Sequence, residues 1–201
     1  MQVEPRSDLF LVRHGETDWN RAGRFQGRSD VPLNAAGIAQ ARAIGRRLPS
    51  LLNSGMSDAD RLAIVSSPLM RARQTADEIS RSIGRDGSDV EIRDELAEIS
   101  YGAWEGLTTH EVKSIYPSQR RARKSDRWNF AAPGGESFAS RLPAIRGFLA
   151  HIDRPTILVC HAGVIKICLY LLGAMEAESA LLNPISQDRI YAWSKRRLAA
   201  H

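Results

Sequence analysis

Short hydrophobic runs alternate along this chain with longer segments in which apolar residues recur every three or four positions. The short runs are typical of buried strands. They lie at residues 8–12, 62–65, 90–93, 156–160 and 189–193. The periodic segments predict amphipathic helices. These span residues 35–52, 68–83, 108–124 with a break at Pro117, 137–152 and 164–172. Because strands and helices alternate, we expect an α/β fold with a largely parallel sheet.

Two polar segments and the end of the chain lack this periodicity. Residues 18–28 carry Gly, Asn and Arg, and residues 128–136 contain Pro and two Gly. Both compositions favour irregular loops that border a site. The chain after Ser194 is expected to be a loose tail. We find no internal repeat, and we expect a single domain over residues 1–201 with its core at about 8–194.

Side chains suited to catalysis follow the predicted strands. They are Arg13, His14, Arg71, Glu98 and His161. Ligands of α/β sheets bind beyond the carboxyl ends of the strands, so we expect these side chains to share a site. Arg71 falls in a first helical turn, where a cation is disfavoured unless it holds an anion. Gly15 is expected to let the backbone approach that anion. Taken singly, each of these residues also fits an ordinary solvated position.

Two histidines, two arginines and one carboxylate fit either a metal site or a phosphate site. Metal sites usually combine locally spaced histidines with several carboxylates or thiolates, and that pattern is missing here. Guanidinium groups repel a cation and match phosphate oxygens in bidentate geometry, so phosphate chemistry is favoured. The side-chain amides of Asn20 and Gln26 could add donors to a phosphate or satisfy turn backbone.

The same residues predict a mechanism. A neutral imidazole could attack phosphorus and form a phosphohistidine, while the arginines and His161 stabilise the charge. Glu98 or Glu105 could protonate the leaving alkoxide and then activate water. Fixed cations supply the electrostatics in this mechanism, so we expect no metal and no cofactor.

The charge and the cysteines restrict the class of partner. The net charge of +5 suits a small anionic substrate. Nucleic-acid binding is the alternative, but no basic arm, repeat or aromatic platform accompanies the charge. The basic runs at 120–124 and 195–197 are interpreted as a solvated helix face and a chain end. Cys160 and Cys168 are expected to be buried thiols. Without a signal peptide or a bilayer-length apolar run, we expect a cytoplasmic location and no membrane partner.

Seven spaced motifs resemble those of the histidine phosphatase superfamily, also called the phosphoglycerate-mutase-like family. They are LVRHGETxWN at 11–20, RFQG at 24–27, LNxxGxxQA at 33–41, SSPLxRAxQTA at 66–76, ExxYGxWEG at 98–106, PGGES at 133–137 and HAG at 161–163. The resemblance covers nearly the whole chain and implies a three-layer α/β/α sandwich. It also implies that His14 is the phosphorylated nucleophile, that Glu98 is the proton donor and that Glu105 is structural. The residues it assigns to the phosphoryl group are Arg13, Arg71 and His161, with Asn20 and Gln26 as secondary contacts.

Within the resemblance, hydrolysis of a small phosphomonoester is favoured over phosphoryl return to a product. Mutases of the family are longer in the middle and usually carry Thr or Ser where Gln26 stands. Members with Phe-Gln-Gly and Pro-Gly-Gly-Glu-Ser are commonly phosphatases. A cofactor-dependent phosphoglycerate mutase and a noncatalytic phosphoester-binding module remain alternatives, although a binding module is expected to lose His14 or Glu98. The sequence leaves the substrate and the oligomeric state open, a homodimer included.

Overall fold

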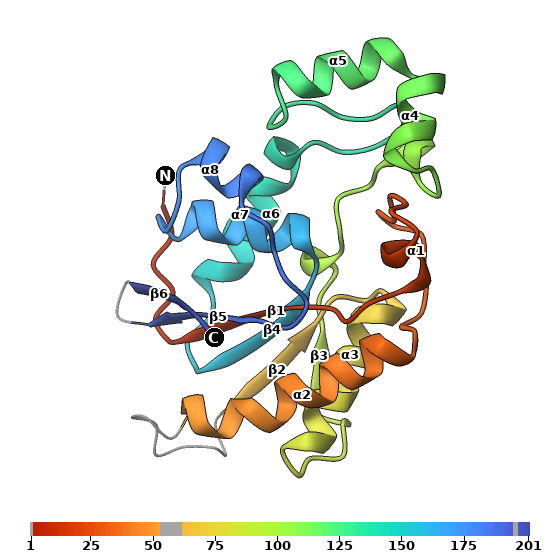
Figure 1. The fold of residues 1–201 in the computed structure, drawn as a ribbon. Coiled ribbons are helices and arrows are strands. Elements are labelled where there is room, and N and C mark those ends of the chain that lie inside the picture. The colour runs from red at the N-terminus through yellow and green to blue at the C-terminus, as the bar shows by residue number, and fades with distance from the viewer. Residues whose placement is uncertain (1, 53–61, 195–196) are drawn as a thin grey trace.

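The computed structural model describes residues 2–52, 62–194 and 197–201 and is built around a six-stranded sheet (Figure 1). The strands are β1 (Leu9–Arg13), β2 (Ala63–Ser66), β3 (Val90–Ile92), β4 (Thr156–Cys160), β5 (Ile190–Ser194) and β6 (Arg197–Ala200). Their order across the sheet is β3-β2-β4-β1-β5-β6. The first four strands pair in parallel, and β5 and β6 add antiparallel pairs at one edge. This confirms the predicted mostly parallel sheet.

Helices cover both faces of the sheet, as the α/β/α sandwich requires (Figure 1). α2 (Ala35–Leu52) and α3 (Met70–Ser82) lie on one face. α6 (Phe138–Ala150), α7 (Ala162–Leu171) and α8 (Ala177–Leu182) lie on the other. The three layers implied by the family resemblance are therefore present.

The central strands β1, β2 and β4 are apolar except at one terminal position each, because both of their faces are buried. In β1, Leu9 and Leu11 pack with α6 and α7 in one core. Phe10 and Val12, which point the other way, pack with α2 and α3 in a second core. Successive residues of a strand point to opposite faces of the sheet. The continuous run at 8–12 therefore correctly predicted a strand that is buried on both faces.

A third, smaller core lies outside these two layers. α4 (Thr109–Ile115) and α5 (Pro117–Ser125) protrude beyond the layer of α6 and α7 (Figure 1). Trp104, Val112 and Ala132 are its buried residues, and Phe25 and Phe130 pack against them. Pro117 stands at the first position of α5, where its missing N–H costs nothing. The break predicted at Pro117 is therefore confirmed, and the exposed basic run of α5 is the solvated helix face that we expected.

Two predictions of irregular structure are wrong. Residues 18–28 contain a short helix, α1 (Asp18–Arg21), which begins with a capping box between Thr17 and Asn20. The chain after Ser194 is not a loose tail in its described part, because β6 pairs with β5 and places Leu198 opposite Trp193. Lys195 and Arg196 of the second basic run lie outside the described residues. The expectation of buried thiols is confirmed, since Cys160 and Cys168 are both buried and free.

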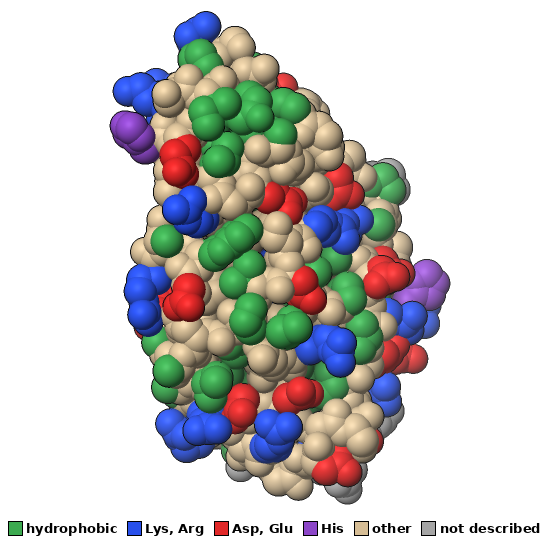
Figure 2. All heavy atoms as spheres, turned by 90° about the vertical axis from the view of Figure 1, so that its right-hand side faces the viewer, with side chains coloured by type: hydrophobic (Ala, Val, Ile, Leu, Met, Phe, Trp, Pro, Cys, Tyr) green, Lys and Arg blue, Asp and Glu red, His purple; other side chains and the backbone are tan. Residues whose placement is uncertain are grey.

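The surface mixes charges of both signs. On the side of the molecule that carries α1, lysines and arginines are interspersed with acidic side chains, and they form no continuous basic stripe (Figure 2). Across the described residues, no helix combines the length and apolar character needed to cross a membrane.

Candidate active site

The two predicted histidines lie at the ends of neighbouring strands. β1 and β4 pair in register up to Arg13 and Cys160. The backbone N–H of His14 then donates to the Cys160 carbonyl at 2.9 Å, which places His14 beside His161. Their ring centroids are 5.1 Å apart, and both side chains are buried. The strand-end rule therefore located this pair correctly.

The hydrogen bonds of His14 define its protonation. Its Nδ1 lies 2.7 Å from the Gly15 carbonyl, which can only accept, so Nδ1 carries the proton. Arg71 Nε, which can only donate, lies 3.3 Å from Nε2, so Nε2 presents its lone pair. Burial lowers the pKa of His14 well below 6.5, and the positive charges of Arg71 and Arg13 lower it further. His14 is thus a neutral imidazole with an unprotonated Nε2.

The loop that carries His14 is held by close backbone packing. A Cβ on Gly15 would lie 2.3 Å from the Gly37 carbonyl oxygen, and a Cβ on Gly37 would lie 2.2 Å from the Glu16 carbonyl oxygen. The Gly15 N–H donates to Thr75 Oγ1 at 3.0 Å. The absence of a side chain on Gly15 admits the start of α2, and the approach of an anion to Gly15 stays a prediction. Gly37 and Thr75 belong to the motifs at 33–41 and 66–76, but their contacts with Gly15 were not predicted, because a residue's partner cannot be read from its own identity.

Arg71 is a fully buried cation at the start of α3. Besides its contact with His14, it donates from Nη1 to the Ser29 carbonyl and from Nη2 to the Gly27 carbonyl, both at 2.8 Å. A guanidinium has five N–H groups, so one donor on each terminal nitrogen remains for an anion. These contacts overturn the alternative of a surface arginine.

Glu105 holds the loop that anchors Arg71. It accepts the backbone N–H groups of Arg28, Ser29 and Tyr101 at 3.0, 2.8 and 3.0 Å, and the Ser29 hydroxyl at 2.7 Å. These hydrogen bonds lower the pKa of Glu105 against the effect of its burial, so it stays an acceptor. Such saturation fits the structural role that the family resemblance implies for Glu105.

Arg13, Gln26 and Asn20 differ in how many of their side-chain polar atoms already have a hydrogen-bond partner. Arg13 donates from Nη1 to the Ile185 carbonyl at 2.7 Å, and its buried Nε has no partner among the described residues. Gln26 Oε1 is likewise buried without a partner there. Asn20 Oδ1 accepts from the Thr17 N–H at 3.2 Å and from Gln187 Nε2 at 2.9 Å. The side-chain oxygen of Asn20 therefore satisfies turn backbone, which was one of its two predicted roles. Its side-chain nitrogen is the group that could bind a ligand.

His161 is oriented by a serine that the sequence analysis did not single out. Its Nε2 lies 2.7 Å from Ser67 Oγ, and Ser67 Oγ already accepts the Leu69 N–H at 3.3 Å. When the Ser67 hydroxyl donates to Nε2, the proton of His161 lies on Nδ1. That buried Nδ1 has no hydrogen-bond partner in the described chain. Burial, Arg71 and His14 hold the pKa of His161 well below 6.5, so it is a neutral donor.

Glu98 lies in the loop after β3, and its buried carboxyl packs beside the start of α7. Its two oxygens accept the backbone N–H groups of Ile99 at 3.0 Å and Gly163 at 3.2 Å. Burial raises the pKa of Glu98, and these donors with Arg71 and Arg13 offset part of that rise. A Cβ on Gly163 would lie 2.4 Å from Glu98 Oε1, so only glycine leaves room for the carboxyl at this position. Burial thus favours the protonated carboxyl, and the surrounding donors and arginines favour the ionised one.

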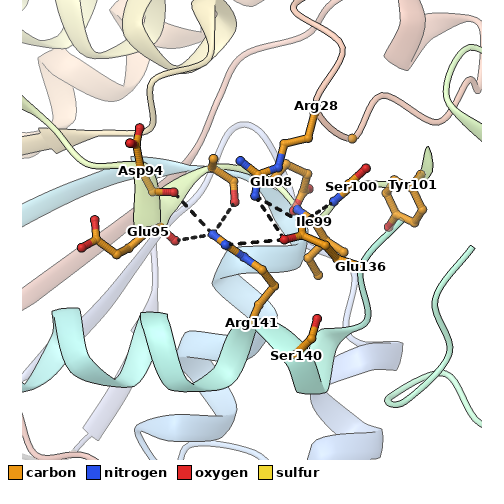
Figure 3. Close-up of polar contacts among 12 residues, drawn as sticks. Arg28, Asp94, Glu95, Glu98, Ile99, Ser100, Tyr101, Glu136, Ser140 and Arg141 are labelled. Carbon is orange, nitrogen blue, oxygen red and sulfur yellow. Dashed lines mark hydrogen bonds and ion pairs between the residues drawn. The ribbon is translucent and has the colours of Figure 1, made fainter. Parts of the chain in front are cut away.

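A polar network fixes the segment that presents Glu98 (Figure 3). Glu136 accepts the Ser100 N–H at 2.9 Å and Arg28 Nη2 at 3.2 Å. Arg141, on α6, donates from Nη2 to three backbone carbonyls. These belong to Asp94, Glu95 and Ala97, at 3.4, 3.0 and 3.4 Å. Three separate segments of the chain therefore meet at Glu136 and Arg141 and support the loop of Glu98.

The structure brings the five predicted strand-end residues into one buried site. Within the described residues, no group of three or more His, Cys, Asp or Glu side chains is arranged to hold a metal ion. The site instead combines two guanidinium groups, two neutral imidazoles and one carboxyl group. Its unused donors suit an anion with several oxygens, and phosphate is such an anion.

Comparison with known proteins agrees with this chemistry. Residues 9–191 match the histidine phosphatase superfamily (branch 1). A bifunctional protein of Mycobacterium tuberculosis is 34% identical over 185 residues, which cover 90% of this chain and 47% of that protein. The chain thus spans about half the length of that relative. A glucosyl-3-phosphoglycerate phosphatase of Mycolicibacterium vanbaalenii is 36% identical, with 82% of this chain and 74% of the relative covered.

Solved structures show the same likeness. A mycobacterial glucosyl-3-phosphoglycerate phosphatase, determined in complex with VO3, superposes with a TM-score of 0.78 at 28% identity. The superposition covers 96% of each chain. The matched family, the aligned relatives and the buried histidine–arginine site all agree: the chain belongs to the histidine phosphatase superfamily.

Proposed function

We propose that this protein hydrolyses phosphomonoesters through a phosphohistidine formed on His14. The observation that carries the proposal is the pair of contacts made by the His14 ring, the Gly15 carbonyl at Nδ1 and the Arg71 Nε donor at Nε2. Together they favour an unprotonated Nε2. Nε2 attacks phosphorus as the bond to the ester oxygen breaks. The ring then becomes cationic, and the Gly15 carbonyl, which already accepts from Nδ1, stabilises that charge.

Charge on the transferring phosphoryl group is met by donors already in place. Arg71 and Arg13 remain cationic despite their burial, and His161 offers its Nδ1–H. The Gln26 and Asn20 side-chain amides would supply secondary contacts. Because these donors are fixed before substrate binds, no metal is needed for the electrostatics of transfer.

Glu98 would act as the acid and then as the base. Its raised pKa keeps a proton available for the leaving alkoxide, which is a poor leaving group without one. The resulting carboxylate takes a proton from water, and the hydroxide attacks phosphorus as the bond to His14 breaks. Phosphate leaves, and both His14 and Glu98 return to their starting protonation.

The relatives support hydrolysis as the reaction. The Mycolicibacterium protein and the aligned mycobacterial structure both carry the name phosphatase. A small phosphorylated metabolite is the corresponding class of substrate for this chain. The alternatives are a cofactor-dependent phosphoglycerate mutase and a noncatalytic binding module, and the experiment below distinguishes both from hydrolysis.

The test measures phosphate release from 4-nitrophenyl phosphate and 3-phosphoglycerate in the presence of EDTA. Wild type is expected to release phosphate, His14→Ala to lose release, and His151→Ala to match wild type because His151 is exposed at the end of α6. Rapid quenching with a labelled ester should trap an acid-labile, base-stable phosphoenzyme that His14→Ala cannot form. Interconversion of phosphoglycerates without release would favour a mutase, and binding without turnover would favour the binding module.

A further inference from the structure

The proposed proton donor lies in a segment with little regular structure. A single helical turn, Asp94–Leu96, comes before Glu98, and the next turn begins only at Gly102. The two backbone donors of the Glu98 carboxyl differ in what they fix. Ile99 is its neighbour in sequence and moves with it, whereas Gly163 ties it to α7. The position of the carboxyl therefore depends on how the backbone on either side of Glu98 is held.

Arg141 holds the backbone that comes before Glu98. Its Nη2 donates to the carbonyls of Asp94, Glu95 and Ala97, so one nitrogen on α6 gathers this stretch (Figure 3). The Arg141 side chain is only 13% exposed, and Ala97 is fully buried. Within the described chain, no other donor reaches the Ala97 carbonyl. A side chain without a donor at position 141 would leave that carbonyl buried and unsatisfied, and the backbone next to Glu98 would have to move to satisfy it.

Glu136 holds the backbone that follows Glu98. Its own N–H donates to the Ser100 carbonyl, and its carboxylate accepts the Ser100 N–H, both at 2.9 Å. The same carboxylate pairs with Arg141, whose Nη1 lies 3.7 Å from Oε1. One ion pair therefore joins the support before Glu98 to the support after it. Arg141 and Glu136 together form a clamp around the proposed proton donor.

The clamp also reaches the part of the site that would hold phosphorus. Glu136 pairs with Arg28 Nη2 at 3.2 Å. Arg28 lies between Gly27 and Ser29 in the chain, and the carbonyls of these two neighbours hold Arg71. Because Arg71 would bind the phosphoryl group, the clamp fixes the proton donor relative to the group that it serves.

We propose that Arg141 is a positioning residue for proton transfer from Glu98 to the leaving oxygen, acting through the backbone it holds and through Glu136. The inference rests on the proposed hydrolysis, in which Glu98 is the acid. Arg141 contacts backbone carbonyls and Glu136, so it acts by geometry. The cations that bear on the pKa of Glu98 are instead Arg71 and Arg13. A misplacement of about 1 Å at a reacting group costs about a hundredfold in rate.

The experiment compares two esters that differ in their need for a proton. Glycerol 3-phosphate releases an alkoxide and needs the acid, whereas 4-nitrophenyl phosphate releases a stable phenolate and does not. The measured quantity is kcat/KM, which covers the steps up to departure of the alcohol and excludes the later hydrolysis of the phosphoenzyme. Arg141→Met should lower kcat/KM for glycerol 3-phosphate by about tenfold to a hundredfold. The value for 4-nitrophenyl phosphate should stay nearly unchanged.

Matched variants and the pH profile identify the cause of that loss. Arg141→Lys should recover part of the activity on glycerol 3-phosphate, because it keeps a donor without the planar fork of the guanidinium. Arg146→Met removes another arginine of α6 and should match wild type on both esters. In Arg141→Met, the alkaline limb for glycerol 3-phosphate should stay where wild type has it, because Arg71 and Arg13 are intact. A shifted limb would mean that Arg141 acts by charge and would refute positioning.

A double variant separates positioning from general support of the fold. Glu98→Gln has no acid to place, so adding Arg141→Met should cause no further loss on glycerol 3-phosphate. Additive losses, or equal losses on the two esters by Arg141→Met alone, would refute the positioning role while hydrolysis stands. If Arg141→Met fails to fold, Glu136→Gln gives the same test, with a smaller selective loss because Arg141 keeps its backbone contacts. Failure of wild type to release phosphate from either ester would refute the proposed hydrolysis itself.

Discussion

At the scale of single residues, the site depends on two histidines that carry their protons on the same ring nitrogen for different reasons. A backbone carbonyl sets the tautomer of His14, and the Ser67 hydroxyl sets that of His161. The resemblance to a known family supplied the histidines, yet only the contacts show which nitrogen of each is free. Ser67 could have been suspected from the Ser-Ser-Pro run at the end of β2, but the sequence does not say which side chain its hydroxyl meets.

Ser67→Ala should separate orientation from binding. Without the hydroxyl donor, the proton of His161 can move to Nε2, and Nδ1 then directs a lone pair at the phosphoryl group. We expect kcat to fall by roughly tenfold to a hundredfold, less than for outright loss of a transition-state donor, with a smaller change in KM. Nitrogen NMR of the histidine ring should report the altered tautomer. An unchanged ring spectrum beside a lower kcat would contradict this explanation.

Glu98 should give the pH profile a distinctive alkaline limb. Because its pKa is raised, kcat/KM for alkyl esters should fall as pH rises through that pKa and the acid loses its proton. On the acid side, activity should persist below pH 6.5, because the pKa of His14 lies well below that value. Glu98→Gln should abolish the alkaline limb for alkyl esters and have less effect on aryl esters, whose leaving groups need no proton. The same loss on both would refute Glu98 as the donor.

At the scale of elements, the hydrophobic runs located every strand of the parallel part. Burial on both faces keeps the interior positions of β1, β2 and β4 apolar, whereas the edge strand β3 is only partly buried and contains Glu91. β6 escaped prediction because it pairs only with β5 at the sheet edge and leaves Arg197, Ala199 and Ala200 exposed, so it forms no hydrophobic run. α1 escaped because four residues cannot show a helical period. The ends of the strands predicted the site residues. The residues of α2, α3 and α6 that hold the site loops were not predicted, because their roles depend on tertiary contacts.

The contact between the His14 loop and α2 offers a test with a matched control. Gly37→Ala places a Cβ 2.2 Å from the Glu16 carbonyl oxygen and 2.7 Å from its nitrogen, and both are backbone atoms that cannot move away cheaply. We expect a loss of about 1–3 kcal/mol in the free energy of unfolding, together with lower activity. Gly147→Ala, in α6 with nothing within 4 Å of the new Cβ, should stabilise the protein by about 0.5–1 kcal/mol. Denaturant unfolding measures both, and equal stability of the two variants would contradict the packing argument.

At the scale of the whole molecule, the net charge predicts less about the binding partner than the placement of the charged side chains does. The net charge of +5 allowed nucleic acid or a small anion, and the interspersed charges of Figure 2 form no stripe for a duplex. The single domain over residues 1–201, the cytoplasmic location and a homodimer stay predictions. The location and the assembly of the protein are determined by contacts outside one folded chain.

Thiol reactivity should report the integrity of the whole core. Burial raises the pKa of Cys168 to about 12 and that of Cys160 well above 9.0, so neither forms a thiolate at neutral pH. The native protein should resist alkylation by iodoacetamide, and both cysteines should react once denaturant unfolds it. Mass spectrometry counts the labelled thiols. Rapid labelling of either cysteine in the native state would contradict its burial.

The small core of Trp104, Val112 and Ala132 has an evolutionary consequence. It supports the excursion of α4 and α5, from which Arg123 comes, while the His14 and His161 strands rest on the two sheet cores. Substitutions under α4 and α5 can therefore change the surroundings of Arg123 without disturbing the strands that carry His14 and His161. Under the proposed function, a lineage built this way can change the ester it accepts by small steps, each of which leaves the proposed catalytic residues in place.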